Sequence, residues 1–183
     1  MQSTNDDGHQ SEPGDIIHSP PTSDRLGKRV VLSGPRVPCT AMNQPHTAAL
    51  HAIHHIGIVV AQLSTSVEWY TSCCGAQQTT GAIFDPLQKV RVMFLKINAG
   101  PLVELVEPVG IDSPAARLAS MGGGLHHLCF EVLDIRQSMS VLQQSGARVV
   151  CEPVPAVAFA GRLIAFMYTQ GRILVELLQK SPE

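Results

Sequence analysis

The sequence has little charge, and neither sign dominates. Charged residues make up 15% of the 183 residues, and 13 Lys and Arg stand against 15 Asp and Glu, which gives a net charge of −2. Proteins that bind nucleic acids or anionic membranes carry a basic excess that neutralises phosphates. The composition therefore argues against both partners and favours a small molecule.

The sequence also lacks the marks of an exported or membrane-embedded protein. Its five cysteines are an odd number without a C-x-x-C pair, and the N-terminus has no basic and apolar signal-peptide pattern. No apolar run approaches the roughly 20 residues that a membrane-spanning helix needs. We expect a globular protein in the reducing cytoplasm.

Residues 1–50 differ in composition from the rest of the chain. They are rich in Pro, Ser, Gly and Asp, and they show no sustained helical or strand periodicity. We expect a disordered N-terminal extension here and a folded domain over residues 51–183.

The remaining chain contains two successive series of strand and helix patterns. In the first series, Thr65 and Glu68 form a candidate capping box for the helix. In the second, Asp134 is the candidate N-cap and Gly146 the stop, and Ser113 caps a short helix between the two series. The predicted strands span residues 55–60, 90–97, 101–108, 127–132, 161–168 and 173–180, and the two longer helices span 63–75 and 134–147.

Two short motifs recur at the same spacing. The double histidine HH begins at residues 54 and 126, and the tetrapeptide LVEL begins at 102 and 174, so both repeat at an offset of 72. Two motifs at one offset indicate internal duplication. In each half the second histidine and the glutamate are 49 residues apart, which pairs His55 with Glu104 and His127 with Glu176.

Strand alternation places the second histidine of each pair on the face away from the helix. In HHLCFEV, His126 shares a face with Leu128, whereas His127 lies on the opposite, less apolar face with Cys129. The first copy alternates in the same way, which places His55 on the corresponding face. If each half curls its sheet around that face, two imidazoles and two carboxylates meet in one cavity.

Such a set of side chains can hold a metal ion. A carboxylate buried in an apolar run costs several kcal/mol unless a cation or a partner compensates it. Two neutral imidazoles and two carboxylates suit a divalent first-row ion and leave positions for water or substrate. The alternative is that the histidines stand in solvent at strand ends and the glutamates lie on exposed faces. The matched spacing favours the metal site.

The four residues and the runs HHIGIVV, GGGLHHLCFEV and ILVELLQ resemble the vicinal oxygen chelate superfamily of glyoxalases, bleomycin resistance proteins and extradiol dioxygenases. Within it, the methylmalonyl-CoA epimerase-like branch is the most similar. The resemblance implies an α+β fold of two tandem βαβββ modules, at 53–110 and 124–180, whose curved, barrel-like mixed sheet surrounds a metal site. It further implies a homodimer and a divalent ion (Co²⁺, Mn²⁺, Ni²⁺ or Zn²⁺) held by His55, Glu104, His127 and Glu176.

The epimerase-like branch implies a metal-dependent epimerase or isomerase. Such an enzyme abstracts a proton next to the metal-chelated carbonyl of a methylmalonyl-CoA-like acyl thioester. Glu176, and with it Glu104, is the expected catalytic carboxylate. The strand that supplies a second acid in some epimerases carries Arg91 and no acid here, so the second acid/base residue stays open. Arg91 and Arg162 are candidate contacts for a carboxylate or phosphate of the substrate.

Other functions stay open because the four ligands do not select the reaction. A glyoxalase-type lyase or isomerase, or a cyclase of secondary metabolism, has the same ligand set in other branches of the superfamily. A metal-free small-molecule binding protein is a third hypothesis, against which the complete ligand set argues.

Overall fold

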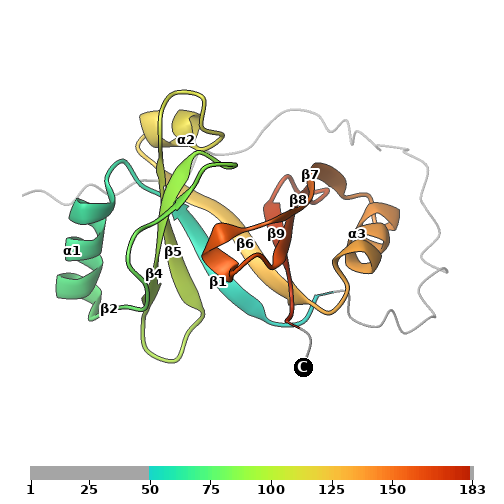
Figure 1. Cartoon of the computed structure of the whole chain (residues 1–183), viewed down its shortest axis with the longest axis horizontal. Helices are drawn as coiled ribbons and strands as arrows, with labels where there is room; N and C mark the ends of the chain where they lie inside the picture. Colours follow the sequence, from blue (N-terminus) through green and yellow to red (C-terminus); the bar gives the residue numbers. More distant parts are fainter. Residues whose placement is uncertain (1–49, 182–183) are drawn as a thin grey trace, which may run out of the picture. The chain divides into compact units, whose positions relative to one another are not determined.

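The computed structural model describes residues 50–181, and the disorder predicted for the N-terminal extension therefore lies outside the described residues. The described chain forms one curved mixed sheet, and the helices α1 and α3 lie on its outer side (Figure 1). The strands are β1 (Ile53–Val59), β2 (Gln77–Gln78), β3 (Ile83–Asp85), β4 (Val90–Lys96), β5 (Leu102–Pro108), β6 (Gly124–Val132), β7 (Arg148–Pro155), β8 (Leu163–Tyr168) and β9 (Leu174–Gln179). The helices are α1 (Leu63–Cys74), α2 (Ala116–Ser120), α3 (Ile135–Gln144) and the 3₁₀ turn η2 (Val157–Phe159), and none of them is long and apolar enough to cross a membrane.

The sheet consists of two similar halves. Its strand order is β2-β4-β5-β1-β6-β9-β8-β7, with β3 also paired to β4. In the first half β1 runs parallel to β5, in the second β6 runs parallel to β9, and the halves join through the antiparallel pair β1–β6. The predicted α+β fold with a curved mixed sheet is confirmed, with the difference that the second strand of the first half is split into β2 and β3.

Strand alternation separates a helix-facing layer from the concave face of the sheet. Neighbouring residues take opposite sides, as Leu177 packs under α3 whereas Leu178 lies on the concave face. The helix-facing layers contain Leu63, Val67, Leu95 and Leu105 under α1, and Ile135, Met139, Met167 and Leu177 under α3. The concave face carries Val59, Val92, Phe94 and Val106 from one half, and Cys129, Ile164, Phe166 and Leu178 from the other.

The two longer helices differ at their N-termini. The Asp134 side chain accepts a hydrogen bond of 2.9 Å from the backbone N–H of Gln137, so the predicted cap of α3 is confirmed. The predicted capping box of α1 is wrong, because the helix already begins at Leu63 and its N-cap makes no side-chain cap bond. The Thr65 hydroxyl, one turn inside the helix, instead donates to the side-chain carbonyl of Gln62.

Strand β7 was not among the strands predicted from the sequence. Its outer position at the end of the sheet explains how it tolerates Pro153 and Pro155, which cannot donate to a ladder. Its pairing with β8 also shifts register on both sides of Cys151. An irregular edge strand of this kind lacks the regular alternation that identifies the central strands.

Candidate metal centre

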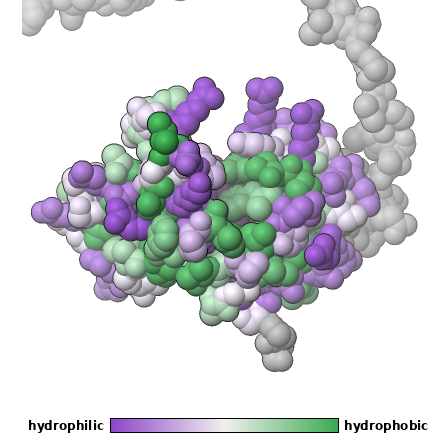
Figure 2. All heavy atoms as spheres, turned by 45° about the horizontal axis from the view of Figure 1, so that its top comes forward, coloured by the Kyte–Doolittle hydropathy of each residue, from purple (hydrophilic) through white to green (hydrophobic). Residues whose placement is uncertain are grey.

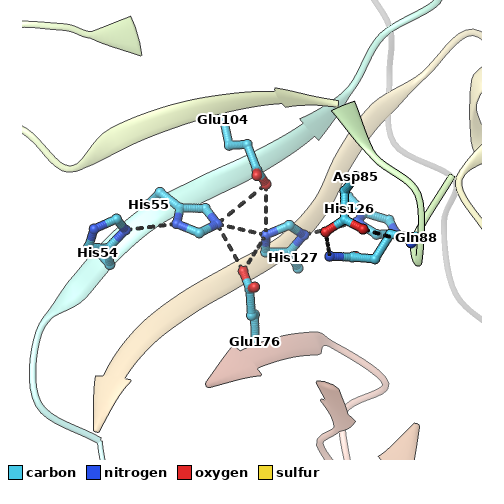
Figure 3. Close-up of polar contacts among 8 residues, drawn as sticks. All are labelled: His54, His55, Asp85, Gln88, Glu104, His126, His127 and Glu176. Carbon is cyan, nitrogen blue, oxygen red and sulfur yellow. Dashed lines mark hydrogen bonds and ion pairs between the residues drawn. The ribbon is translucent and has the colours of Figure 1, made fainter. Parts of the chain in front are cut away.

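Two histidines and two glutamates from the central strands converge on the concave face. Figure 3 shows Glu104 of β5 and Glu176 of β9 reaching from opposite sides toward the imidazoles of His55 and His127. The two Nε2 atoms are 2.9 Å apart, Oε2 of Glu176 lies 3.0 and 3.1 Å from them, and Oε2 of Glu104 lies 3.4 and 3.3 Å from them. All four residues are at most 6% exposed. The four side chains that the repeat singled out therefore lie together in the structure.

The strand register explains this convergence. The parallel pairs place Glu104 beside Gly57 and Glu176 beside Cys129, at positions that differ by the repeat offset. The antiparallel pair then places Gly57 beside His127. The duplicated halves thus bring equivalent residues to one point on both sides of the β1–β6 junction.

Gly57 makes room for one of the imidazoles. A Cβ atom at this position would lie only 2.2 Å from Cε1 of His127 and within 2.6 Å of two ring nitrogens. Real side chains do not approach a ring so closely, so the His127 ring occupies space that a larger residue would fill. No local sequence pattern indicates this role of Gly57, because the contact depends on the pairing of Gly57 with His127, about 70 residues further along the chain.

The first histidine of each pair bonds the second. Nδ1 of His54 lies 2.9 Å from Nδ1 of His55, and Nδ1 of His126 lies 2.9 Å from Nδ1 of His127. The β1–β6 register shifts at both double histidines, as β-bulges do when they re-aim a side chain. A proton on Nδ1 of His55 and His127 in these bonds leaves each Nε2 free to bind a metal.

The charges in the cluster stabilise one another. Burial alone would lower the pKa of both inner imidazoles, but the hydrogen bonds and charges of Glu104 and Glu176 raise the pKa of His55 to about 8 and of His127 to about 10. Burial would also raise the pKa of the carboxyl groups, yet the two histidines hold both pKa values below the usual range. The carboxylates therefore stay ionised and attract positive charge to the point where the four side chains meet.

The groups beside the cluster stay neutral. Burial, aided by the charge of His127, lowers the pKa of His126 to about 4, and burial with the charge of His55 lowers the pKa of His54. Burial, followed by the charge of a nearby glutamate, raises the pKa of the fully buried Cys129 thiol. Cys129 thus acts as a small packing group rather than as a thiolate nucleophile.

The donor set fits a divalent ion. Oε2 of Glu176 is fully buried and has no hydrogen-bond partner of good geometry among the described residues, although both imidazoles lie about 3 Å away. One ligand atom from each of the four residues lies within 4.8 Å of the others. The two carboxylates would cancel the double positive charge of such an ion, and the two neutral imidazoles would complete the ligand set. The ion would also give Oε2 of Glu176 a partner.

Comparisons with known proteins agree with this geometry. The model of the Glyoxalase/Bleomycin resistance protein/Dioxygenase superfamily matches residues 54–166. The chain belongs to this superfamily. It is 33% identical to the ethylmalonyl-CoA/methylmalonyl-CoA epimerase of Cereibacter sphaeroides over 132 residues, which cover 69% of this chain and 96% of that protein.

Solved structures of epimerases share the fold of this superfamily member. Methylmalonyl-CoA epimerase from Mycobacterium tuberculosis matches with a TM-score of 0.66 and 26% identity, covering 76% of this chain and 95% of that one. A variant of the Streptomyces coelicolor methylmalonyl-CoA epimerase in complex with 2-nitronate-propionyl-CoA matches with a TM-score of 0.64 and 29% identity, covering 73% and 99%. The predicted resemblance to the epimerase-like branch is thereby confirmed.

The cavity of this glyoxalase-superfamily chain is narrow. It has a volume of about 20 Å³, which is room for a water molecule or a metal ion. Turn η2 contacts β3 across the cavity, and the Phe159 ring stacks on the His55 ring with centroids 5.7 Å apart. Asp85 adds a third buried carboxylate to the wall, and its Oδ1 accepts hydrogen bonds from the backbone of Leu87 and Gln88. A substrate larger than water fits this cavity only if its wall, which includes η2, opens.

The two arginines proposed as substrate contacts have carboxylate partners in the chain. Arg91 is half exposed, lies on the opposite face of β4 from the cavity residues Val90 and Val92, and pairs with Glu107 at 3.1 Å. Arg162 bonds Glu131 at 3.0 Å and the Gln179 carbonyl at 2.7 Å. The structure does not bring either guanidinium to the cluster.

Proposed function

We propose that this chain is a divalent-metal-dependent epimerase that inverts the carbon next to the thioester carbonyl of a methylmalonyl-CoA-like acyl-CoA. The observation that carries the proposal is the buried cluster of His55, His127, Glu104 and Glu176. It occurs in a chain whose relatives bear the name of this activity. A relative in complex with an acyl-CoA compound supports the same substrate class.

The four side chains of the cluster are the proposed metal ligands. Nε2 of His55 and His127 and one oxygen each of Glu104 and Glu176 would hold Co²⁺, Mn²⁺, Ni²⁺ or Zn²⁺. When bound, the ion supplies a Lewis acid that polarises the thioester carbonyl and acidifies the neighbouring C–H bond. The neutral His54 and His126 would keep the imidazoles oriented through their Nδ1 atoms.

Glu176 is the proposed general base. Its buried, ionised carboxylate takes the proton from the carbon, and the electron pair of that C–H bond moves into the enolate. A proton returned to the opposite face of the planar enolate inverts the centre. Glu104 approaches the imidazoles from the side opposite Glu176, which supports it as the partner carboxylate in this step (Figure 3).

The proposal also covers the cellular location of the protein, its assembly and the substrate contacts of two arginines. The four cysteines of the described chain are free, which supports a reducing compartment such as the cytoplasm. Exposed apolar side chains, including Ile111 at 93% and Met121 at 71%, support a homodimer that covers some of them. The substrate contacts of Arg91 and Arg162 remain predictions that need one of their ion pairs to open.

The reaction tests the proposal directly. A single epimer of methylmalonyl-CoA, incubated in deuterated water with the Co²⁺-loaded protein, should invert and take up deuterium at the carbon between the two carbonyls. The chelator-treated protein is the control, and it should show neither change beyond the uncatalysed rate. If the loaded protein gives no exchange with this or a related 2-substituted malonyl-CoA, the proposed function is wrong.

A further inference from the structure

Three arginines line a groove outside the metal cavity. Two adjoining hollows of about 370 and 590 Å³ share Tyr168 and Arg172, with Arg117 in the smaller and Arg148 in the larger. Within the described residues, no hydrogen bond or ion pair engages these three guanidinium groups. By contrast, Arg91 and Arg162 each form an ion pair with a glutamate. Three unpaired guanidiniums around one groove favour an anionic ligand.

The groove leads to the metal centre. His126 lines both the metal cavity and the smaller hollow. Tyr168 follows Phe166 on the same face of β8, and Phe166 packs edge-on against the ring of His127. Since Tyr168 pairs with Leu174, two residues before Glu176, the groove begins about 7 Å along the strand from a proposed ligand. A molecule that reacts at the metal centre can therefore extend into the groove.

The shape and lining of the groove suit a nucleotide on a flexible arm. Figure 2 shows the face of the molecule that has α2 turned forward, where apolar residues lie between hydrophilic side chains that project outward, and the smaller hollow is lined by the apolar Leu118 and Leu174 beside its arginines. Each hollow is within the range of small-molecule sites, roughly 300–1,000 Å³. The Tyr168 ring is 44% exposed and offers a flat surface for a base between arginines that can bind phosphates.

The backbone of Arg172 points to a role beyond folding. Its φ of 59° is in the left-handed region, in the tight turn that joins β8 to β9. Glycine adopts this conformation without strain, whereas an arginine there is strained. An arginine held in that conformation, exposed and unpaired at the groove, is more easily explained by a ligand than by the turn.

We infer that the groove lined by Arg117, Arg148, Tyr168 and Arg172 binds the phosphate-bearing nucleotide end of the acyl-CoA substrate. The inference rests on the proposed function, since it assumes a thioester of coenzyme A at the metal centre. The arginines hold the phosphates, the Tyr168 ring supports the adenine, and the pantetheine arm passes His126 toward the metal centre.

Calorimetric titration with coenzyme A itself tests the groove without using the reaction. We expect Arg172→Gly and Arg148→Ala each to weaken binding about tenfold or more, because each removes a charge-assisted phosphate contact. Arg136→Ala removes the same charge from an exposed position on α3 and should leave binding unchanged. Because glycine relieves the strain at position 172, Arg172→Gly should keep or raise the Tm while it loses affinity. A loss of Tm, or coenzyme A affinity equal to that of the wild type, would overturn the role of Arg172.

A second experiment distinguishes failure of this inference from failure of the proposed function. Turnover of methylmalonyl-pantetheine, which lacks the nucleotide, should be the same in Arg172→Gly and in the wild type, whereas kcat/KM for methylmalonyl-CoA falls about tenfold in the variant. If both thioesters lose activity equally, or neither does, the nucleotide does not bind in this groove although the enzyme is an epimerase. If coenzyme A binds through these arginines and no thioester is epimerised, the nucleotide site is supported and the proposed function is wrong.

Discussion

Replacing Gly57 with alanine should destroy the metal centre while leaving the fold in place. The added Cβ would lie 2.2 Å from Cε1 of His127, and its other nearest atoms are the two nitrogens of the same ring. Ordinary contacts begin at 3.4 Å, so the ring has to move by about 1.2 Å. Metal–ligand distances tolerate about 0.2 Å. His127 would therefore leave the ligand set.

The expected result is a large loss of metal affinity at modest cost in stability. Mutation of a group that only orients a metal ligand weakens metal binding about 10–100-fold. Displacement of the ligand itself should weaken it at least as much. Calorimetric titration of the metal-free variant with Co²⁺ measures the change in metal affinity, and circular dichroism checks the fold. Gly81→Ala is the matched control, because nothing lies within 4 Å of its added Cβ. Wild-type Co²⁺ affinity in the Gly57→Ala variant would refute the reasoning.

The other predictions concern proton transfer, orientation, access and the N-terminus. Glu176→Gln should keep most of the metal but slow deuterium exchange roughly 100-fold or more, whereas Glu104→Gln should be milder; the reverse order would show that Glu104 is the base. His126→Phe should weaken Co²⁺ binding about tenfold, since Nδ1 of the neighbouring ligand loses its partner, and unchanged affinity would exclude an orienting role. Phe159→Ala should speed the binding of substrate in stopped-flow measurements, and an unchanged rate would show that η2 does not limit access. A chain that begins at Met42 should retain the activity of the 183-residue chain in the exchange assay, and a marked loss would assign a function to the preceding residues.

The parts of the site that follow from local pattern could be predicted from sequence. Period-2 alternation assigns His127 and Cys129 to the concave face, and the common offset of 72 links them to the first half. The helix stop at Gly75 is likewise a local property, and its φ of 63° shows the left-handed conformation that favours glycine.

The parts that depend on pairing between distant strands could not be predicted. The space that Gly57 leaves for an imidazole arises only when β1 and β6 are in register. Phe159 comes from a turn of alanine-rich sequence with no period, yet it covers His55. Arg148 and Arg172 are 24 residues apart in sequence and share a groove only because Arg148 pairs with Tyr168 at the end of the sheet.

The claim that four convergent side chains form a metal site can be tested by one titration. Co²⁺ added to metal-free protein should bind at one ion per chain, and the paired variant His55→Ala with His127→Ala should lose that binding while circular dichroism shows the same fold. Absence of Co²⁺ binding by the wild type, or equal binding by the double variant, would contradict the account.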